Sequence, residues 1–358
     1  MQRRKFLQTA GAAVTVAAPS LAGSAPVSKK TIEWKMVTAW PKNFPGAGTG
    51  AQRLAQRIGE MSGGRLTVKV YAAGELVPAF EVFDAVSQGT AEMGHATSYY
   101  WAGKLPAAQF FSSVPFGMTA NELNAWIYHG GGQALWDELY APYNLLPRLA
   151  GNAGVQMAGW FRREIKSLDD LKGLKMRIQG VAAEVLKRSG VTPVALPAGD
   201  IFTSLQSGLI DAAEFTGPWN DLALGLYRVA KYYYYPGWHE PGTPAECTIN
   251  KKAFEDLTTD LQAIVTSACQ AINSDLYAEY TANSFQALQS LVDQRQVQLR
   301  RFPDDVLQAL RPHAADVRAE MGAKDAATRK VYRAYEKFLK QVSGWTEKSE
   351  YAFLQART

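Results

Sequence analysis

Four polar residues are candidates for ligand chemistry: Gln156, Arg177, Glu214 and Glu240. Arg177 lies at the end of a strand predicted at Leu174–Ile178, and Glu214 ends a second strand predicted at Leu209–Glu214. Open α/β sheets bind their ligands at such strand ends. A guanidinium placed there can hold a carboxylate through two parallel hydrogen bonds. The structural alternative is that these charges belong to ordinary ion pairs, and the residues alone leave both interpretations open.

A glycine-rich segment gives the strongest enzyme signal. Gly46–Ala51 matches the G-x-G-x-x-G/A pattern of dinucleotide-binding loops, between a predicted strand and a predicted helix. A segment with Pro41 and Pro45 separates it from the strand that ends at Thr38, whereas the fingerprint requires a tight turn. The next strand, Arg65–Tyr71, ends without the acid that would bind a ribose. We interpret the glycines as a loop at a helix start and keep an exported NAD(P)-dependent oxidoreductase as the alternative.

Other catalytic and metal motifs are incomplete. The segment His129–Gly132 resembles a lipase oxyanion loop, but the chain has no G-x-S-x-G motif to supply a nucleophile. The four histidines are far apart in the sequence, which argues against a zinc site. Cys247 and Cys269 are too few for a cysteine-rich metal site. The aromatic runs Tyr99–Trp101 and Tyr232–Tyr235 either fill a core or line a small-ligand pocket.

Composition excludes several protein classes. The chain has 358 residues, of which 47% are hydrophobic and 20% charged, as is typical of a globular protein of about two domains. Its net charge is +5, but three basic residues lie within the first 25. The remaining 35 basic and 33 acidic residues nearly balance, which argues against a dedicated nucleic-acid binder.

The N-terminus has the pattern of an export signal. Arg3 and Arg4 precede a short apolar, alanine-rich stretch, and Ala22 and Ala25 suit a cleavage site. The arginine pair resembles a twin-arginine signal, with an ordinary secretory signal as the alternative. No cysteine for lipid attachment follows, so we expect a soluble periplasmic protein. In that oxidising compartment Cys247 and Cys269 can pair, but their spacing decides nothing.

Short strands and helices alternate as far as residue 214. Strands are predicted at 31–38, 65–71, 91–97, 152–161, 174–178, 192–196 and 209–214, and helices at 52–61, 79–87, from 119, 182–189 and 200–207. Beyond residue 252, helices are predicted at 253–293, 303–321 and 326–342, around a strand at 297–301. The alternation indicates an α/β fold with mainly parallel sheets.

Local signals refine this order. Thr119 and Glu122 fit a capping box, and the glycines of 130–132 interrupt the helix that follows. The segments Phe83–Glu92 and Phe202–Asp211 share a pattern of helix, glycine and acid. The repeat indicates either two similar lobes with a ligand cleft between them or two ordinary helix-to-strand turns.

Several segments together resemble the periplasmic solute-binding proteins of TRAP transporters. These segments are Tyr71–Leu76 (YAAGEL), Ser167–Arg177 (SLDDLKGLKMR) and Ala198–Glu214 (AGDIFTSLQSGLIDAAE). Three longer strings resemble the branch of that family that binds 2-oxo acids such as pyruvate: Trp126–Gly132, Gly151–Ile165 and Tyr232–Trp238. The resemblance extends from the signal to about residue 300.

The resemblance implies an α/β protein of two lobes, with mixed sheets, strands crossing between the lobes, a long bracing helix and a helical C-terminus. One lobe would comprise 31–154 with about 215–290, the other 155–214 with about 295–310, and C-terminal helices would follow over 311–358. The implied function is capture of a small 2-oxo monocarboxylate in the periplasm, without catalysis, and its delivery to the membrane permease subunits.

The resemblance also implies roles for the site residues. Arg177 pairs with the ligand carboxylate, and Gln156 contacts both the ligand and a cation, usually sodium. Glu214 binds the cation through its carboxylate, and Phe215 through its backbone carbonyl, since hard cations take oxygen ligands. The ligand-binding set is Gln156, Arg177, Phe215, Glu240 and Tyr100.

Two features of this chain leave alternatives open. Phe215 stands where the branch is expected to have tryptophan, so the sequence leaves the chain length of the ligand open, and lactate or pyroglutamate are alternative ligands. Glu240 adds negative charge beside Glu214, which favours calcium over sodium. The helical C-terminus, with Trp345 and Tyr351, either forms a homodimer or packs on its own chain.

Overall fold

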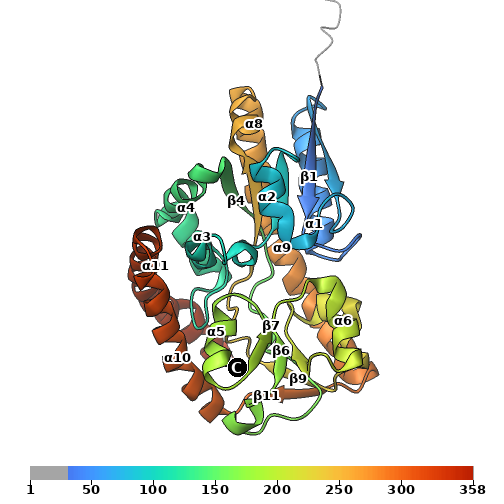
Figure 1. Ribbon diagram of the computed structural model, residues 1–358, viewed down its shortest axis with the longest axis vertical. Coiled ribbons are helices and arrows are strands. Elements are labelled where there is room, and N and C mark those ends of the chain that lie inside the picture. Colours follow the sequence, from blue (N-terminus) through green and yellow to red (C-terminus); the bar gives the residue numbers. More distant parts are fainter. Residues whose placement is uncertain (1–30, 358) are drawn as a thin grey trace, which may run out of the picture. The chain divides into compact units, whose positions relative to one another are not determined.

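The computed structural model describes residues 31–357 (Figure 1). The predicted export signal over 1–25 lies outside the described residues. Two mixed β-sheets and the helices around them make up the described chain. Within residues 31–357, no helix is both long enough and apolar enough to cross a membrane.

The first sheet has five strands in the order β2-β1-β3-β10-β4. Their bounds are β1 Ile32–Thr38, β2 Leu66–Tyr71, β3 Met93–Ala96, β4 Leu145–Asn152 and β10 Pro244–Asn250. Strands β2 and β3 pair with β1 in parallel, while β10 is antiparallel to both β3 and β4. The late strand β10 therefore joins the two early parts of the chain within one sheet.

The second sheet has six strands in the order β11-β9-β5-β8-β6-β7. Their bounds are β5 Gly159–Phe161, β6 Lys175–Arg177, β7 Thr192–Val194, β8 Ala212–Ala213, β9 Tyr232–Tyr235 and β11 Gln298–Arg301. Strand β6 is parallel to β7 and β8, and β5 is antiparallel to β8 and β9. Because β6 and β8 run side by side in the same direction, the residues at their ends meet at one edge.

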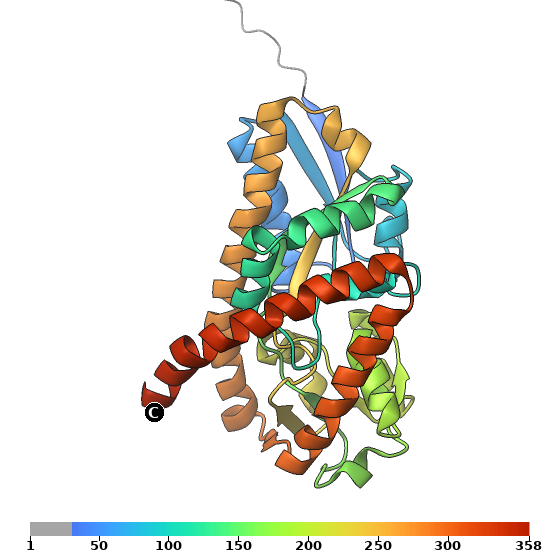
Figure 2. The ribbon, with the colours of Figure 1, turned by 90° about the vertical axis from the view of Figure 1, so that its left-hand side faces the viewer.

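The helices surround these sheets and include one long element. Their bounds are α1 Ala47–Met61, α2 Val82–Ser87, α3 Ala120–His129, α4 Gly132–Tyr140, α5 Gly180–Arg188, α6 Ala198–Ser207, α7 Pro218–Leu224, α8 Lys251–Glu255, α9 Thr259–Gln289, α10 Asp304–Ala323, α11 Ala326–Thr346 and α12 Ala352–Arg357. Helix α9 packs on α1, β4 and α7 and runs past both sheets (Figures 1 and 2). Helix α11 packs along α3 and α4.

The first sheet owes its order to burial against α1 and α9. Leu54 and Ile58 recur at helical spacing on α1 and are fully buried, as in an amphipathic helix. They share a hydrophobic cluster with Met36 of β1 and with Val265 and Ile272 of α9. The long helix α9 thus packs in one hydrophobic cluster with α1 and with β1 of the first sheet.

Most of the predicted elements are confirmed, including the Thr119–Glu122 capping box and the helix break at the glycines, where Gly131 adopts φ 86°. The parallel sheets predicted from alternation are wrong in part, because β5 and β10 are antiparallel. Strands β4, β9 and β10 were not predicted. The strand predicted over 152–161 is wrong at its centre, where the chain leaves β4 at Asn152 and resumes as β5 at Gly159.

Candidate functional site

Arg177 and Glu214 meet where β6 and β8 end. Arg177 lies beside Ala213 in the register, so Glu214 is the next residue along the neighbouring strand. Its Nη1 donates to Glu214 Oε1 at 2.5 Å and to the Glu214 carbonyl at 2.8 Å, while Nε donates to the Leu196 carbonyl. Both side chains are fully buried. The structural ion pair considered from the sequence is therefore present, but it leaves part of each group free.

Buried polar atoms without a hydrogen-bond partner in the described chain converge around this ion pair. They include Arg177 Nη2, Glu214 Oε2, Gln156 Oε1 and both ring nitrogens of His239. Buried polar groups in folded proteins are nearly always satisfied, so such a concentration points to a ligand site. The free atoms comprise a cationic donor and two oxygen acceptors, which fit a carboxylate and a cation respectively.

Gln156 is oriented by Glu240. Glu240 Oε2 accepts from Gln156 Nε2 at 2.7 Å, from Ser113 Oγ at 2.9 Å and from Thr243 Oγ1 at 3.3 Å. Because the amide nitrogen faces the carboxylate, the amide oxygen points the other way and remains an acceptor. Gly237 makes this arrangement possible, since a Cβ there would lie 2.1 Å from the Gln156 carbonyl oxygen.

Glu240 carries an unusual proton affinity. Burial raises its pKa to about 7, and repulsion from Glu214 adds to the effect, whereas the charge of Arg177 opposes it. The three charged side chains thus form one electrostatic unit, in which two carboxylates share a single guanidinium. A cation placed among them would relieve the repulsion between the carboxylates.

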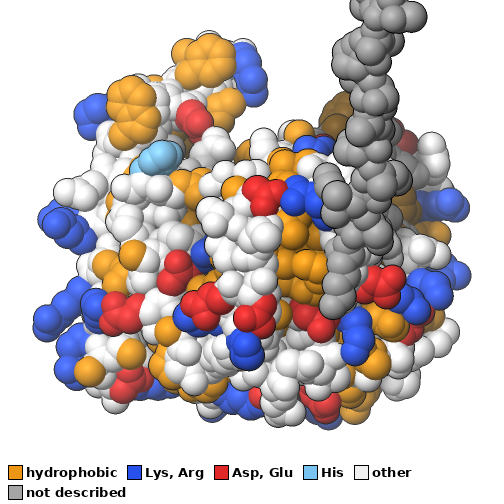
Figure 3. Space-filling view, turned by 90° about the horizontal axis from the view of Figure 1, so that it is seen from above, with side chains coloured by type: hydrophobic (Ala, Val, Ile, Leu, Met, Phe, Trp, Pro, Cys, Tyr) orange, Lys and Arg blue, Asp and Glu red, His pale blue; other side chains and the backbone are white. Residues whose placement is uncertain are grey.

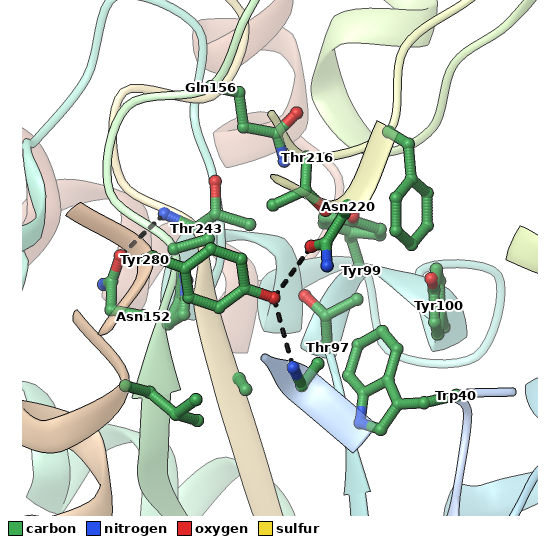
Figure 4. Close-up of a pocket in the computed structure, with 16 residues that line it drawn as sticks. Trp40, Thr97, Tyr99, Tyr100, Asn152, Gln156, Thr216, Asn220, Thr243 and Tyr280 are labelled. Atoms are coloured by element: carbon green, nitrogen blue, oxygen red, sulfur yellow. Dashed lines mark hydrogen bonds between the residues drawn. The ribbon is translucent and has the colours of Figure 1, made fainter. Parts of the chain in front are cut away.

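An aromatic pocket borders this cluster and shares Gln156 and Phe215 with it (Figure 4). Trp40, Tyr99 and Tyr100 form the wall of this small pocket opposite the long helix. The guanidinium of Arg177 lies 5.3 Å from the centre of the Phe215 ring. Burial raises the pKa of Tyr100 to about 12, so its hydroxyl stays a donor. The structure therefore places the predicted residues Tyr100 and Phe215 at the pocket and beside the charged cluster.

The aromatic runs divide between the two roles considered for them. Tyr99 and Tyr100 line the pocket, whereas Trp101 is buried in the core. In the second run, Tyr233 stacks on Trp160 with ring centres 4.0 Å apart. That run therefore supports the second sheet.

His239 is the site residue that the sequence did not reveal. It is 1% exposed, directly precedes Glu240, and its Nε2 lies 3.6 Å from Glu214 Oε2. Oxygen or nitrogen atoms of Glu214, His239 and Glu240 all lie within 4.8 Å of one another, so the three side chains can surround a metal ion. The separation of the four histidines concealed this, because the partner of His239 is Glu214, a carboxylate from a distant segment of the chain. The adjacent His239–Glu240 pair was the available signal.

The segment Gly46–Ala51 was interpreted as a loop at a helix start, with a nucleotide-binding loop as the alternative, but Ala47–Ala51 form the first residues of α1 and only Gly46 precedes it. The backbone N–H of Ala47, at the start of α1, is bonded to the hydroxyl of Tyr280, which also donates to Asn220. A Cβ on Gly46 would lie 2.4 Å from the Tyr280 ring, and one on Gly50 would lie 2.5 Å from Leu276. These glycines let α1 and α9 approach closely, and the Tyr280 hydroxyl occupies a backbone N–H at the start of α1 of the kind that would bind a pyrophosphate.

Comparison with known proteins matches the chain to one family of solute-binding proteins. Residues 36–325 match the model of the bacterial extracellular solute-binding proteins, family 7. The chain is 40% identical over 358 residues to a monocarboxylate 2-oxoacid-binding periplasmic protein of Nostoc sp., covering 99% of this chain and 98% of that protein.

Two solved structures extend the comparison. A TRAP transporter solute-binding protein from Bordetella bronchiseptica, a dimer with copurified calcium and picolinate, is 38% identical with a TM-score of 0.89, covering 91% of this chain and 97% of that chain. A protein from Pseudoalteromonas atlantica with bound sodium and pyruvate is 41% identical with a TM-score of 0.88, covering 91% and 99%. The chain therefore belongs to family 7 of the bacterial extracellular solute-binding proteins, the solute-binding components of TRAP transporters.

Proposed function

We propose that the protein captures a small, pyruvate-like 2-oxo monocarboxylate together with a cation and delivers it to the membrane permease of a TRAP transporter. The main support for this proposal is a set of buried polar atoms that have no hydrogen-bond partner among the described residues. They are Arg177 Nη2, Glu214 Oε2 and Gln156 Oε1. A 2-oxo acid has a carboxylate and a carbonyl oxygen on adjacent carbons. One guanidinium and one cation can bind those two groups at the same time.

Within this proposal, Arg177 binds the carboxylate. Its Nη1 and Nε are engaged by the protein, so the side chain is fixed and only Nη2 is left to reach the ligand. Fixing the guanidinium in advance reduces the ordering cost of binding. Tyr100 and Phe215 exclude water from the site, and Glu240 lines it while holding Gln156 in place.

The cation would be held by Gln156 Oε1, the Glu214 carboxylate and the backbone carbonyl of Phe215. This all-oxygen set suits sodium or calcium, and the free buried acceptors fit such an ion. When bound, the cation supplies positive charge that polarises the 2-oxo oxygen and so distinguishes a 2-oxo acid from a plain acid. The calcium and sodium of the Bordetella and Pseudoalteromonas proteins support both choices.

The ligand is captured, not converted. Every charged side chain that we assign to the site is held by another protein group or serves the cation, and no organic cofactor is needed for these roles. We propose that each sheet forms the centre of one lobe and that the lobes close on the ligand. Strand β9 then belongs with the second sheet, although the segment 215–290 was assigned to the first lobe from the sequence.

Lactate and pyroglutamate are the alternative ligands within the same fold. Arg177 binds the carboxylate that all these acids share, so discrimination between them rests on how the cation binds the second oxygen and on the shape of the aromatic wall. A thermal-shift titration with pyruvate, lactate and pyroglutamate, after the protein has been unfolded, freed of ligand and refolded, tests this. We expect pyruvate to raise the melting temperature most, and only with sodium or calcium present; a ligand at about 100 times its Kd adds about 2.7 kcal/mol. A larger, cation-independent shift with lactate would refute the 2-oxo acid assignment.

We further propose twin-arginine export and a homodimer. The C-terminal helices expose Trp345, Tyr351 and Phe353 by 70%, 55% and 63%. Orange side chains are visible on the projecting part at the upper left of Figure 3. The dimer of the Bordetella protein supports a homodimer, and the exposed aromatic side chains suggest these helices as its interface. The dimer is tested by comparing the sedimentation of the protein with and without residues 344–358. The export route is tested with a reporter fused to residues 1–30, whose export is compared with that of a variant in which Arg3 and Arg4 are replaced by lysine.

A further inference from the structure

We infer that His95 is a positioning residue of the ligand pocket: it holds the indole of Trp40, and Trp40 is the wall at which the carbon tail of the bound acid ends. The inference rests on the proposed function, because it concerns the tail of the same carboxylate ligand. His95 is fully buried and does not line the pocket, so it influences chain-length preference only through Trp40.

The first sheet brings the two residues together. In the parallel pairing of β1 and β3, Thr38 lies opposite His95, and Trp40 follows two residues after the end of β1. The backbone N–H of Ala39 donates to the His95 carbonyl at 3.1 Å. The indole Nε1 of Trp40 donates to His95 Nδ1 at 2.7 Å. Both the main chain and the indole of this segment are therefore fixed to β3.

Only one tautomer of His95 fits these contacts. Its Nε2 lies 3.1 Å from the carbonyl oxygen of Ala150, which can only accept, so Nε2 carries the proton. Nδ1 is then an acceptor, and it faces an indole N–H, which can only donate. Burial lowers the pKa of His95 to about 4, so the ring is neutral near neutral pH. The indole N–H of Trp40 is thus fully satisfied by the protein.

Trp40 lies on the side of the pocket away from the charged cluster. The pocket meets the cluster at Gln156 and Phe215 and extends from there to Trp40. Tyr100 lies between the two ends: it interacts electrostatically with Arg177, and its ring centre is 6.5 Å from that of Trp40. Figure 4 shows the indole nitrogen on the edge of the ring away from Gln156. An acid with its carboxylate on Arg177 therefore directs its tail toward the carbon atoms of the indole.

The lining of the pocket suits a short apolar tail. Among residues 31–357, no charged side chain lines it, so a second carboxylate on the tail would be buried without a partner. The pocket is small, so the position of the indole of Trp40 decides how many carbons fit. The indole cannot move aside without leaving its buried N–H unpaired, which is costly. His95 thereby opposes the entry of longer tails.

The test is calorimetric titration of the refolded, ligand-free protein with pyruvate and with 2-oxohexanoate, both in calcium, and the readout is the ratio of the two Kd values. Trp40→Phe removes part of the wall. His95→Phe keeps a ring but removes both nitrogens, with His95→Leu as a second variant if the first does not fold. His95→Gln keeps one acceptor and one donor. His129→Phe is the matched control, because His129 is exposed on α3 and does not line the pocket.

We expect the affinity for 2-oxohexanoate relative to pyruvate to rise at least tenfold in Trp40→Phe. It should rise at least fivefold in His95→Phe, because an indole that is no longer held yields to a longer tail. His95→Gln and His129→Phe should stay within twofold of the wild type. Adding His95→Phe to Trp40→Phe should change the ratio less than twofold, since phenylalanine has no N–H to hold. An unchanged ratio in a folded His95→Phe or His95→Leu protein, or a further fivefold change in the double variant, would overturn the inference.

Lactate and 2-hydroxyhexanoate are titrated in parallel to separate this inference from the proposed function. If only these hydroxy acids bind, the proposed function is refuted, while the ratio of their Kd values still tests the role of His95. If 2-oxo acids bind the wild type and His95→Phe leaves their ratio unchanged, only this inference fails. If none of the four acids binds, both are refuted.

Discussion

Glu214→Gln separates the charge of Glu214 from its hydrogen bond. Glu214 Oε1 accepts from Arg177 at 2.5 Å, and both side chains are fully buried. Glutamine keeps an oxygen acceptor for that bond but leaves the guanidinium without its carboxylate. Removing one partner of a buried ion pair costs about 3–5 kcal/mol. We expect the lower end of this range, because Glu240 also interacts electrostatically with Arg177.

The expected loss is therefore about 3 kcal/mol in the free energy of unfolding of the ligand-free protein. At about 2 °C per kcal/mol for a chain of this size, the melting temperature falls by about 6 °C. Calorimetric titration with pyruvate over a series of calcium concentrations gives the second readout. Since the variant lacks the charge that holds the cation, its pyruvate affinity should no longer depend on calcium.

The matched control is Glu246→Gln at pH 6. Glu246 is as deeply buried as Glu214, but it accepts from Ser98, Tyr140 and Thr248 and has no arginine partner among residues 31–357. Burial raises its pKa to about 7, so it is mostly protonated at pH 6 and glutamine replaces it closely. This variant should retain the calcium dependence. If Glu214→Gln also retains it in full, the reasoning about the cation site is refuted.

Three other predictions concern separate features. Burial raises the pKa of Glu246 to about 7, so its carboxyl resists ionisation in the folded state. The wild type should therefore lose unfolding free energy relative to Glu246→Gln as the pH rises from about 4.5 to 7. A difference between the two proteins that stays constant with pH in urea titrations would contradict this. Phe215→Ala should weaken pyruvate binding about tenfold by calorimetry, through loss of the cation–π contact and the pocket wall, yet keep its calcium dependence, because only the side chain is removed. Cys247 and Cys269 are free and buried, and the hydrogen bond between them together with burial raises the pKa of the Cys247 thiol, so Ellman's reagent should label both only in denaturant; fast labelling of the native protein would disagree.

Local sequence signals predicted the elements whose two faces differ. Helix α1 buries one face, and strand β1 alternates in burial over its first five residues, so their hydrophobic spacing was visible. Strand β10 is buried at every position and contains Glu246 and Asn250, so neither alternation nor an apolar run marked it. Strand β4 contains Pro147, which argues against a strand in sequence reasoning.

Sequence analysis could predict only those site residues whose position at the end of a strand indicated that they face the ligand. Arg177 and Glu214 ended predicted strands, and the structure brings them together because β6 and β8 are parallel neighbours. His239 and Ser113 lie in irregular segments that reach the site only through the tertiary fold. No hydrophobic period marks such residues, and the only local pointer to His239 was its neighbour Glu240.

The most direct test of the account is a crystal structure of the refolded protein with pyruvate and calcium. We predict the ligand carboxylate on Arg177 Nη2 and the cation about 2.3–2.6 Å from Gln156 Oε1, the Glu214 carboxylate and the Phe215 carbonyl, with the 2-oxo oxygen also on the cation. Pyruvate bound elsewhere in the aromatic pocket, or on Arg177 with no cation beside Glu214, would contradict the central claim.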